Sequence, residues 1–169
     1  TLDTIALGDG AGDWIHTTAG ADIVLGGDGP DIISTGSDTF RDVVLGDNGA
    51  AIFVSNNDGR IATDRLQSIT TSNADGNTTE NDQITTGAGN DIVIGGNARD
   101  SISTGSGDDV VAGDNAAATI DVDITQPTTT YILRTITTLT PTIGDIDTIT
   151  TDEGADIVIG GTAGDSITA

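Results

Sequence analysis

Aspartate residues recur every nine positions along much of this 169-residue chain. An aliphatic residue stands two places after each of them, and a turn sequence that in most units contains glycine precedes it. Turn carbonyls together with one carboxylate per turn are the hard oxygen ligands that Ca²⁺ prefers. The spacing therefore predicts a regular series of calcium ligands. Eleven aspartates share the pattern, with two extra residues inserted before the fourth: Asp13, Asp22, Asp31, Asp42, Asp82, Asp91, Asp100, Asp109, Asp147, Asp156 and Asp165.

The same residue types indicate which elements must hold these carboxylates. The chain has 25 Asp but only 2 Glu, together with 24 Gly. Asp and Gly disfavour helix interiors and favour turns, so we expect an all-β protein with almost no helix. Disorder is the alternative for a chain with high charge and few aromatic residues. The regular return of Ile, Val and Leu argues against it.

The composition excludes several classes of protein. A net charge of -22 makes nucleic-acid binding very unfavourable, because phosphate backbones repel an acidic chain. No apolar run is long enough for a membrane span, and no leader segment is recognisable. The absence of cysteine excludes disulfides and thiolate metal sites. Because initiator Met and targeting segment are both lacking, we expect a segment of a larger protein.

The repeated units resemble the glycine- and aspartate-rich nonapeptide of the repeats-in-toxin (RTX) family over about two-thirds of the chain. The resemblance implies a right-handed parallel β-roll, in which six residues of each unit form a calcium-binding turn and three form a short strand. It also implies type I secretion and an extracellular or bacterial cell-surface location. The strand-centre aliphatic residues are expected to point inward and stack on those of neighbouring coils.

Successive turns alternate between two kinds. The turns at 8–13, 26–31, 95–100 and 160–165 contain Gly-Gly or Gly-Asp. Those at 17–22, 35–42, 86–91, 104–109 and 151–156 begin with Thr. If consecutive units lie on opposite sides of the roll, one coil takes 18 residues. We call the two sides the Gly edge and the Thr edge.

Two long insertions interrupt a single solenoid domain. We expect repeat blocks at about 3–48, 82–115 and 147–169, separated by insertions at about 49–81 and 116–146. The first two blocks align and end in a matching Gly-Asp-Asn. The chain therefore holds two modules, each made of four nonapeptides and an insertion, and the start of a third.

The insertions are predicted to form β-hairpins that pack on one sheet. Strands after Thr-type turns, such as 92–94, are apolar on both faces, which indicates a sheet covered on both sides. Hairpin turns are expected at 57–59 and 126–128. The alternative is that the outer apolar stripe binds a partner. The insertion residues expected to pack against Val43, Leu45, Ile92 and Ile94 are Phe53, Leu66, Ile69, Tyr131, Leu133 and Ile136.

Calcium is expected between turns that follow one another on the same edge. We predict roughly five to nine ions, with Asp47 and Asp114 extending the Gly edge. The alternative for each aspartate is an Asx turn without metal. Four departures from the motif put individual sites in question: Ala98, Ala163, Arg99 and the lengthened turn at 35–42.

These features predict a calcium-binding structural segment of a large secreted protein. We expect it to fold on Ca²⁺ after export and to act as a rigid spacer or folding element, with calcium and neighbouring repeats of the parent chain as partners. An ice- or glycan-binding face is the alternative, because Ser and Thr form regular rows on one sheet and Thr17, Thr35, Thr86, Thr104 and Thr151 line one edge. An enzyme is not expected, since the only histidine, His16, lies on a polar strand face.

Overall fold

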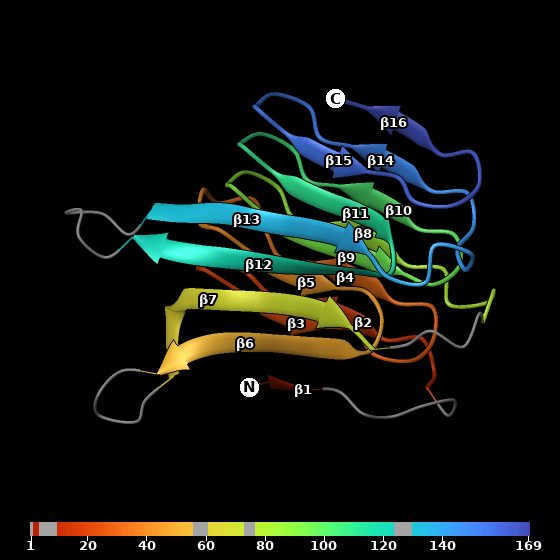
Figure 1. Ribbon diagram of the computed structural model, residues 1–169, viewed down its shortest axis with the longest axis horizontal. Coiled ribbons are helices and arrows are strands. Elements are labelled where there is room, and N and C mark those ends of the chain that lie inside the picture. Colours follow the sequence, from red (N-terminus) through yellow and green to blue (C-terminus); the bar gives the residue numbers. More distant parts are fainter. Residues whose placement is uncertain (1, 4–9, 56–60, 73–76, 124–129) are drawn as a thin grey trace.

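A computed structural model describes residues 2–3, 10–55, 61–72, 77–123 and 130–169 of the chain (Figure 1). Every regular element within these ranges is a β-strand, and the strands form three sheets. Two are parallel sheets formed by the repeat blocks, and the third is formed mainly by the insertions. The all-β parallel roll is therefore confirmed, and the expected turns at 57–59 and 126–128 lie outside the described residues. No helix in the described ranges could serve as a membrane span.

The first parallel sheet, which we call the outer sheet, turns one face to solvent. The central aliphatic residues of its four inner strands, such as Ile33 and Ile84, are buried, whereas Ile15 and Ile167 on the two end strands and most flanking residues are at least partly exposed. The strands lie in the order β16-β14-β10-β8-β4-β2. Their bounds are β2 (Trp14–His16), β4 (Ile32–Ser34), β8 (Gln83–Thr85), β10 (Ser101–Ser103), β14 (Thr148–Thr150) and β16 (Ser166–Thr168).

The second parallel sheet, the middle sheet, has the order β15-β11-β9-β5-β3. It contains β3 (Ile23–Leu25), β5 (Val43–Leu45), β9 (Ile92–Gly96), β11 (Val110–Asp114) and β15 (Ile157–Ile159). In the second block, partners lie 18 residues apart, as in Ile92↔Val110, whereas in the first block the lengthened turn makes the separation 20, as in Ile23↔Val43. Across the first insertion Val43 pairs directly with Ile92, so the roll continues past the insertion without a break.

The third sheet, the covering sheet, is antiparallel in every pairing. Its order is β1-β6-β7-β12-β13, so the two insertions form two hairpins that lie side by side (Figure 1). Its strands are β1 (Leu2–Asp3), β6 (Gly49–Ser55), β7 (Ile61–Thr71), β12 (Ala116–Asp123) and β13 (Thr130–Thr138).

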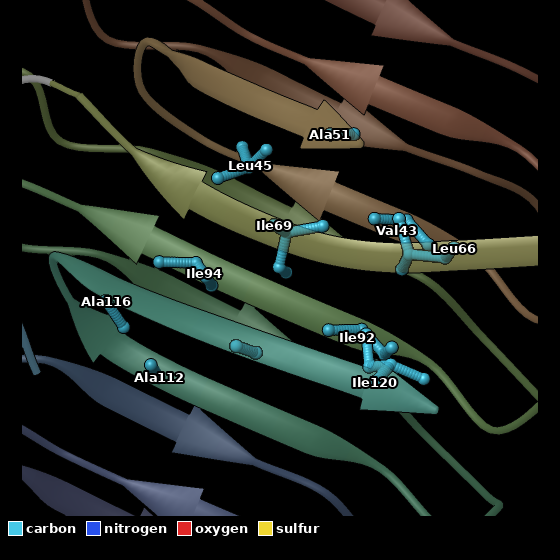
Figure 2. Packing of buried hydrophobic residues seen from close by; sticks show 11 residues of the cluster. Val43, Leu45, Ala51, Leu66, Ile69, Ile92, Ile94, Ala112, Ala116 and Ile120 are labelled. Atoms are coloured by element: carbon cyan, nitrogen blue, oxygen red, sulfur yellow. The ribbon is translucent and has the colours of Figure 1, made fainter. Parts of the chain in front are cut away.

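Two apolar layers hold the three sheets together. Between the outer and middle sheets lies one residue from each strand except β16, including Val44, Ile84 and Val93. The second layer lies between the middle and covering sheets, where Leu45 and Ile94 pack with insertion residues (Figure 2). The covering role of the insertions is thus confirmed. The apolar residues of β5 and β9 are buried beneath this cover, whereas Ile157 on the end strand β15 is 44 % exposed.

The insertion residues fill this second layer to different degrees. Leu66 and Ile69 are fully buried, and Phe53, Leu133 and Ile136 are partly buried against the same cluster. The side chain of Tyr131 lies outside the described part of the structure. Full burial of one Leu or Ile side chain stabilises the fold by about 1.5–3 kcal/mol. The hairpins are therefore an integral part of the domain.

Candidate functional site

The eleven repeat aspartates form two continuous ladders, one along each edge of the roll. On the Gly edge, Oδ1 of each carboxylate accepts a hydrogen bond from the main-chain N–H of the aspartate one coil earlier. This bond fixes the carboxylate against the neighbouring turn. The donor and acceptor pairs are Asp13 to Asp31 (2.7 Å), Asp31 to Asp82 (2.8 Å), Asp82 to Asp100 (2.8 Å), Asp100 to Asp147 (2.9 Å) and Asp147 to Asp165 (3.0 Å).

The Thr edge repeats the same bond. Asp42, after the lengthened turn, keeps its place in the ladder. Asp91 and Asp156 join the ladder across the two insertions. The pairs are Asp22 to Asp42 (2.9 Å), Asp42 to Asp91 (2.8 Å), Asp91 to Asp109 (2.8 Å) and Asp109 to Asp156 (2.9 Å).

The second carboxylate oxygen distinguishes the two edges. On the Gly edge, Oδ2 of four aspartates is buried and accepts no hydrogen bond from any described residue. A buried, unsatisfied oxygen on an ionised carboxylate is costly unless a cation compensates it. The four aspartates are Asp31, Asp82, Asp100 and Asp147.

Glycine at the first position of these turns leaves room for oxygens to converge. A methyl group built on Gly46 would lie 2.0 Å from Oδ2 of Asp82 and 2.5 Å from the carbonyl oxygen of Gly95. A methyl group on Gly95 would meet Oδ2 of Asp100 and the carbonyl of Gly113, both at 2.3 Å. Each cradle thus combines a carboxylate from one turn with a carbonyl from the next, which is a donor set that Ca²⁺ accepts.

Thr hydroxyls take the corresponding role on the other edge. Oδ2 of Asp22 accepts a hydrogen bond from Thr17 Oγ1 at 2.7 Å, and Oδ2 of Asp156 accepts one from Thr151 at 2.8 Å. The Thr35 hydroxyl donates in the same way to Oδ2 of Asp42. The two central aspartates of this edge, Asp91 and Asp109, retain a buried Oδ2 without a hydrogen bond of normal geometry from the described residues, although the hydroxyls of Thr86 and Thr104 offset part of the rise in their pKa that burial causes.

These contacts correct one part of the alternative in which the protein has an ice- or glycan-binding face. The Thr side chains at the start of the turns form the edge that the ice-binding alternative requires to face solvent. Four of them are buried: Thr35, Thr86, Thr104 and Thr151. Because their side chains are turned away from solvent, this row is not available to bind an external ligand.

Burial raises the pKa of the ladder carboxyls, because it penalises their charged form. The pKa rises to about 6 for Asp31 and Asp42, to about 7 for Asp147 and to about 8 for Asp82. The pKa of Asp100 is raised well above its ordinary value, first by burial and then by the neighbouring Asp82. Without compensating cations, much of the Gly edge would carry protons at neutral pH.

The ladders supply one carboxylate per coil rather than a compact cluster. Among the described residues, no group of three or more Asp, Glu or His side chains gathers around one point. A cation at these turns would therefore depend mainly on main-chain carbonyls, with carboxylates contributed singly by successive coils.

The repeat blocks match the family described as RTX calcium-binding nonapeptide repeat (4 copies). The match covers residues 7–39, 77–111 and 144–168, which together make up more than half of the chain. The chain belongs to the RTX family. It is thus a calcium-binding repeat region of a kind that is structural and typically found in secreted proteins. No curated protein and no solved structure matches it.

Asp47 and Asp114 stand beside the RTX ladder of the Gly edge, which passes directly from Asp31 to Asp82. Each accepts a main-chain hydrogen bond from the next coil, from Asn97 to Asp47 Oδ2 and from Thr162 to Asp114 Oδ2, both at 2.5 Å. In both residues Oδ1 is buried without a hydrogen bond from the described residues. Burial raises the pKa of Asp47 to about 9.

The departures from the RTX motif leave the turn geometry intact. Ala98 and Ala163 replace the fourth-position glycine, yet they adopt φ angles of +66° and +73°. This left-handed conformation costs an L-residue roughly 1–2 kcal/mol, which the surrounding roll must offset. The Arg99 side chain points outward and pairs with Asp145 at 3.6 Å, so its charge does not enter the turn.

A buried polar network next to the first insertion was not predicted from the sequence. Oε1 of Glu80 accepts a hydrogen bond from Asn77 Nδ2 at 2.9 Å, and Oε2 accepts one from Asn97 Nδ2 at 3.2 Å. Asn115 in turn donates to Asn97 Oδ1 at 2.5 Å. The third-position asparagines that recur in the RTX turns were the available signal. Glu80 itself had none, because it lies in the insertion.

Proposed function

We propose that Ca²⁺ bound along the turn edges folds this RTX region, which then acts as a rigid spacer or folding element in a secreted protein. The supporting observation is the set of buried Oδ2 atoms on the Gly edge, each close to a carbonyl oxygen of the next coil. Folding these carboxylates without a counterion would leave them either buried and charged or protonated.

The ladders suggest how many ions the chain holds. The Gly edge has five steps between successive aspartates, and the Thr edge has four. One ion per Gly-edge step gives the lower limit of the expected range, and occupancy of both edges gives the upper limit. We expect the Gly edge to bind more tightly, because most Thr-edge carboxylates already have a hydroxyl donor.

The ligands follow from this assignment. Gly-edge ions would be held by Asp13, Asp31, Asp82, Asp100, Asp147 and Asp165 with turn carbonyls. Weaker Thr-edge ions would use Asp91 and Asp109 first, and then Asp22, Asp42 and Asp156. Asp47 and Asp114 would add a further carboxylate where each insertion leaves the roll.

Calcium binding would also determine where the chain folds. Extracellular calcium modules bind with dissociation constants of about 10⁻⁴–10⁻³ M, so millimolar Ca²⁺ adds on the order of 1.4 kcal/mol per site at the tighter limit. Five such sites add roughly 7 kcal/mol, which is comparable with the whole stability of a typical domain. At submicromolar Ca²⁺ this contribution vanishes. The chain would then stay unfolded inside the cell and fold after export.

Calorimetric titration of decalcified protein with Ca²⁺, followed in parallel by circular dichroism, tests this function. We expect at least five ions and a transition from coil to β-structure. Titration with Mg²⁺ is the control, because its smaller shell and near-octahedral geometry suit these turns poorly. A complete β signal in chelator would contradict calcium-driven folding.

A second candidate function rests on the solvent face of the outer sheet. Ser101, Thr148 and Ser166 are exposed and lie in register on adjacent strands. Such a row of hydroxyls could bind a regular ligand such as ice or a glycan. Thermal hysteresis or glycan-array binding that is lost in Thr148→Lys, with calcium stoichiometry unchanged, would support this role. Binding that survives Thr148→Lys would exclude this row.

A further inference from the structure

The two insertions are structurally equivalent hairpins. Ala51 pairs with Ile69 in the first hairpin, and Ala118 pairs with Ile136 in the second. The register shifts after the next residue pair in both, between Ile52 and Phe53 and between Thr119 and Ile120. Both hairpins also close in the same way. The N–H of Ser72 donates to Asn48 O at 2.8 Å, and that of Leu139 donates to Asn115 O at 2.7 Å.

Adjacent hairpins pair with each other through a defined register. In the junction between β7 and β12, Ile69 lies opposite Ala118 and Thr70 opposite Ala117. The short strand β1 meets β6 in the equivalent way, because Leu2 lies opposite Ala51 and Asp3 opposite Ala50. The same register at two places indicates a standard junction between the end of one hairpin and the start of the next.

The three sheets advance in step along the roll. Each complete module contributes two strands to the outer sheet, two to the middle sheet and two to the covering sheet, as β8 and β10, β9 and β11, and β12 and β13 do. Neighbouring strands lie about 4.7–4.9 Å apart in parallel and antiparallel sheets alike. Adding modules therefore produces no mismatch between the roll and its cover.

Among the described residues, no strand pairs with the far side of β13. β13 is the last strand of the covering sheet, and it is nine residues long. Ile69, inside the junction, is 0 % exposed, whereas its equivalent Ile136 is only half-buried. Leu66 is 1 % exposed, and its equivalent Leu133 is also half-buried. A long edge strand with apolar residues is a template for pairing with another strand.

We propose that the open edge of β13 binds the first insertion strand of a further module of this same repeat, so that the covering sheet continues from module to module. The occupant is defined by continuity with the β7–β12 junction. It is a strand with small residues after an Asn, as in Gly49-Ala50-Ala51 and Ala116-Ala117-Ala118. Ala51, Ala116 and Ala118 are fully buried, so larger side chains would separate the covering sheet from the roll.

The hydrogen-bond pattern shows which amides of β13 would bond to the added strand. The N–H of Leu139 bonds to Asn115, and bonded and non-bonded pairs alternate along an antiparallel ladder. The amides of Ile136 and Thr138 therefore point to the open edge, whereas that of Thr137 points to β12. The alternation also directs the amide of Ala118 away from β13, toward the preceding hairpin.

A chain lengthened by one hairpin tests the proposal. A second copy of residues 105–150 is appended after Ala169, which continues the repeat in register. Amide hydrogen exchange is then measured in saturating Ca²⁺. We expect exchange at Ile136 and Thr138 to slow by tenfold or more, toward the rate at Ile69. Thr137 should already be protected in the original chain and serves as the internal reference.

The matched control carries Ala118→Pro in the appended copy alone. Proline there removes the amide that would bond to the β13 edge and leaves the bonds within that hairpin in place. We expect the protection of Ile136 to be lost while the added calcium ions are still bound. Unchanged exchange at Ile136 in the lengthened chain, or equal protection by the proline copy, would overturn the proposal.

Discussion

The two edges of the roll carry the same aspartate ladder but differ at the first residue of each turn. On the Thr edge, Thr17, Thr35 and Thr151 donate a hydroxyl to the free oxygen of the ladder carboxylate. On the Gly edge that position is glycine, and the free oxygens of Asp82 and Asp100 instead face a carbonyl of the next coil. Replacing a donor with an open space therefore leaves the second carboxylate oxygen unsatisfied, which is the arrangement that the proposed calcium sites require.

An aspartate ladder alone therefore does not define a metal site. Both ladders use Oδ1 for the main-chain bond to the neighbouring coil, which is a structural role. Only the environment of Oδ2 separates a carboxylate that requires a cation from one that a hydroxyl already satisfies. Asp91 and Asp109 are intermediate, because they lie on the Thr edge and yet the hydroxyls of Thr86 and Thr104 reach their buried Oδ2 atoms without a hydrogen bond of normal geometry.

Removal of calcium is expected to have the largest effect. With excess chelator at pH 8, we expect loss of most β-structure, because the Gly-edge carboxylates lose compensation together with roughly 7 kcal/mol of binding free energy. Circular dichroism with stepwise Ca²⁺ return measures the transition. If the Gly edge binds more tightly, about five ions should restore most of the signal. If all nine ions were needed to restore the signal, the two edges would not differ in their affinity for calcium.

The metal-free protein should become more stable as the pH falls. The pKa of the folded-state carboxyl is raised to about 6 for Asp31, about 7 for Asp147, about 8 for Asp82 and about 9 for Asp47. Stability from these protonated groups is full near pH 4 and is lost as the pH rises through 6 to 9. We expect a difference of several kcal/mol between pH 5 and pH 8, since one pKa unit corresponds to about 1.4 kcal/mol.

Thermal unfolding in chelator at the two pH values measures this effect. In saturating Ca²⁺ we expect the protein to be more stable at pH 8 than at pH 5, because protons compete with the cation for the same carboxylates. Greater stability at pH 8 than at pH 5 in chelator would show that the Gly-edge carboxyls are not the source of instability.

Much of the fold was predictable because the repeat itself encodes it. The nine-residue spacing predicted both ladders, and the apolar faces of strands such as 92–94 predicted the cover. The division between the edges was visible only as Gly or Thr at the first turn position, and its meaning depended on where Oδ2 points. Glu80 could not have been found, because an insertion residue gains its role only when the roll brings Asn97 beside it.

A matched pair of aspartate substitutions separates the edges directly. Asp82→Asn keeps an oxygen for the Asp31 N–H but removes the buried charge. We expect it to lower stability in Ca²⁺ by about 1–3 kcal/mol, and to raise the stability of the metal-free protein at pH 8. Asp42→Asn should change either state by less than about 1 kcal/mol, because Thr35 can still bond to the amide. Denaturant unfolding with and without calcium measures the stability of both variants. Equal effects of the two substitutions would contradict the proposed difference between the edges.

The substitution with the smallest expected effect makes one Thr-edge turn resemble a Gly-edge turn. Thr35→Val keeps the shape of the buried side chain but removes the hydroxyl that donates to Asp42. We expect a cost of about 1–2 kcal/mol in chelator at pH 8, because Oδ2 is left buried without a donor. Thr85→Val on the exposed face of the outer sheet is the control and should change stability by less than about 0.5 kcal/mol.

In saturating Ca²⁺ the Thr35→Val cost should shrink, since a cation can replace the missing donor. An equal cost with and without calcium would mean that the hydroxyl and the cation do not serve the same oxygen.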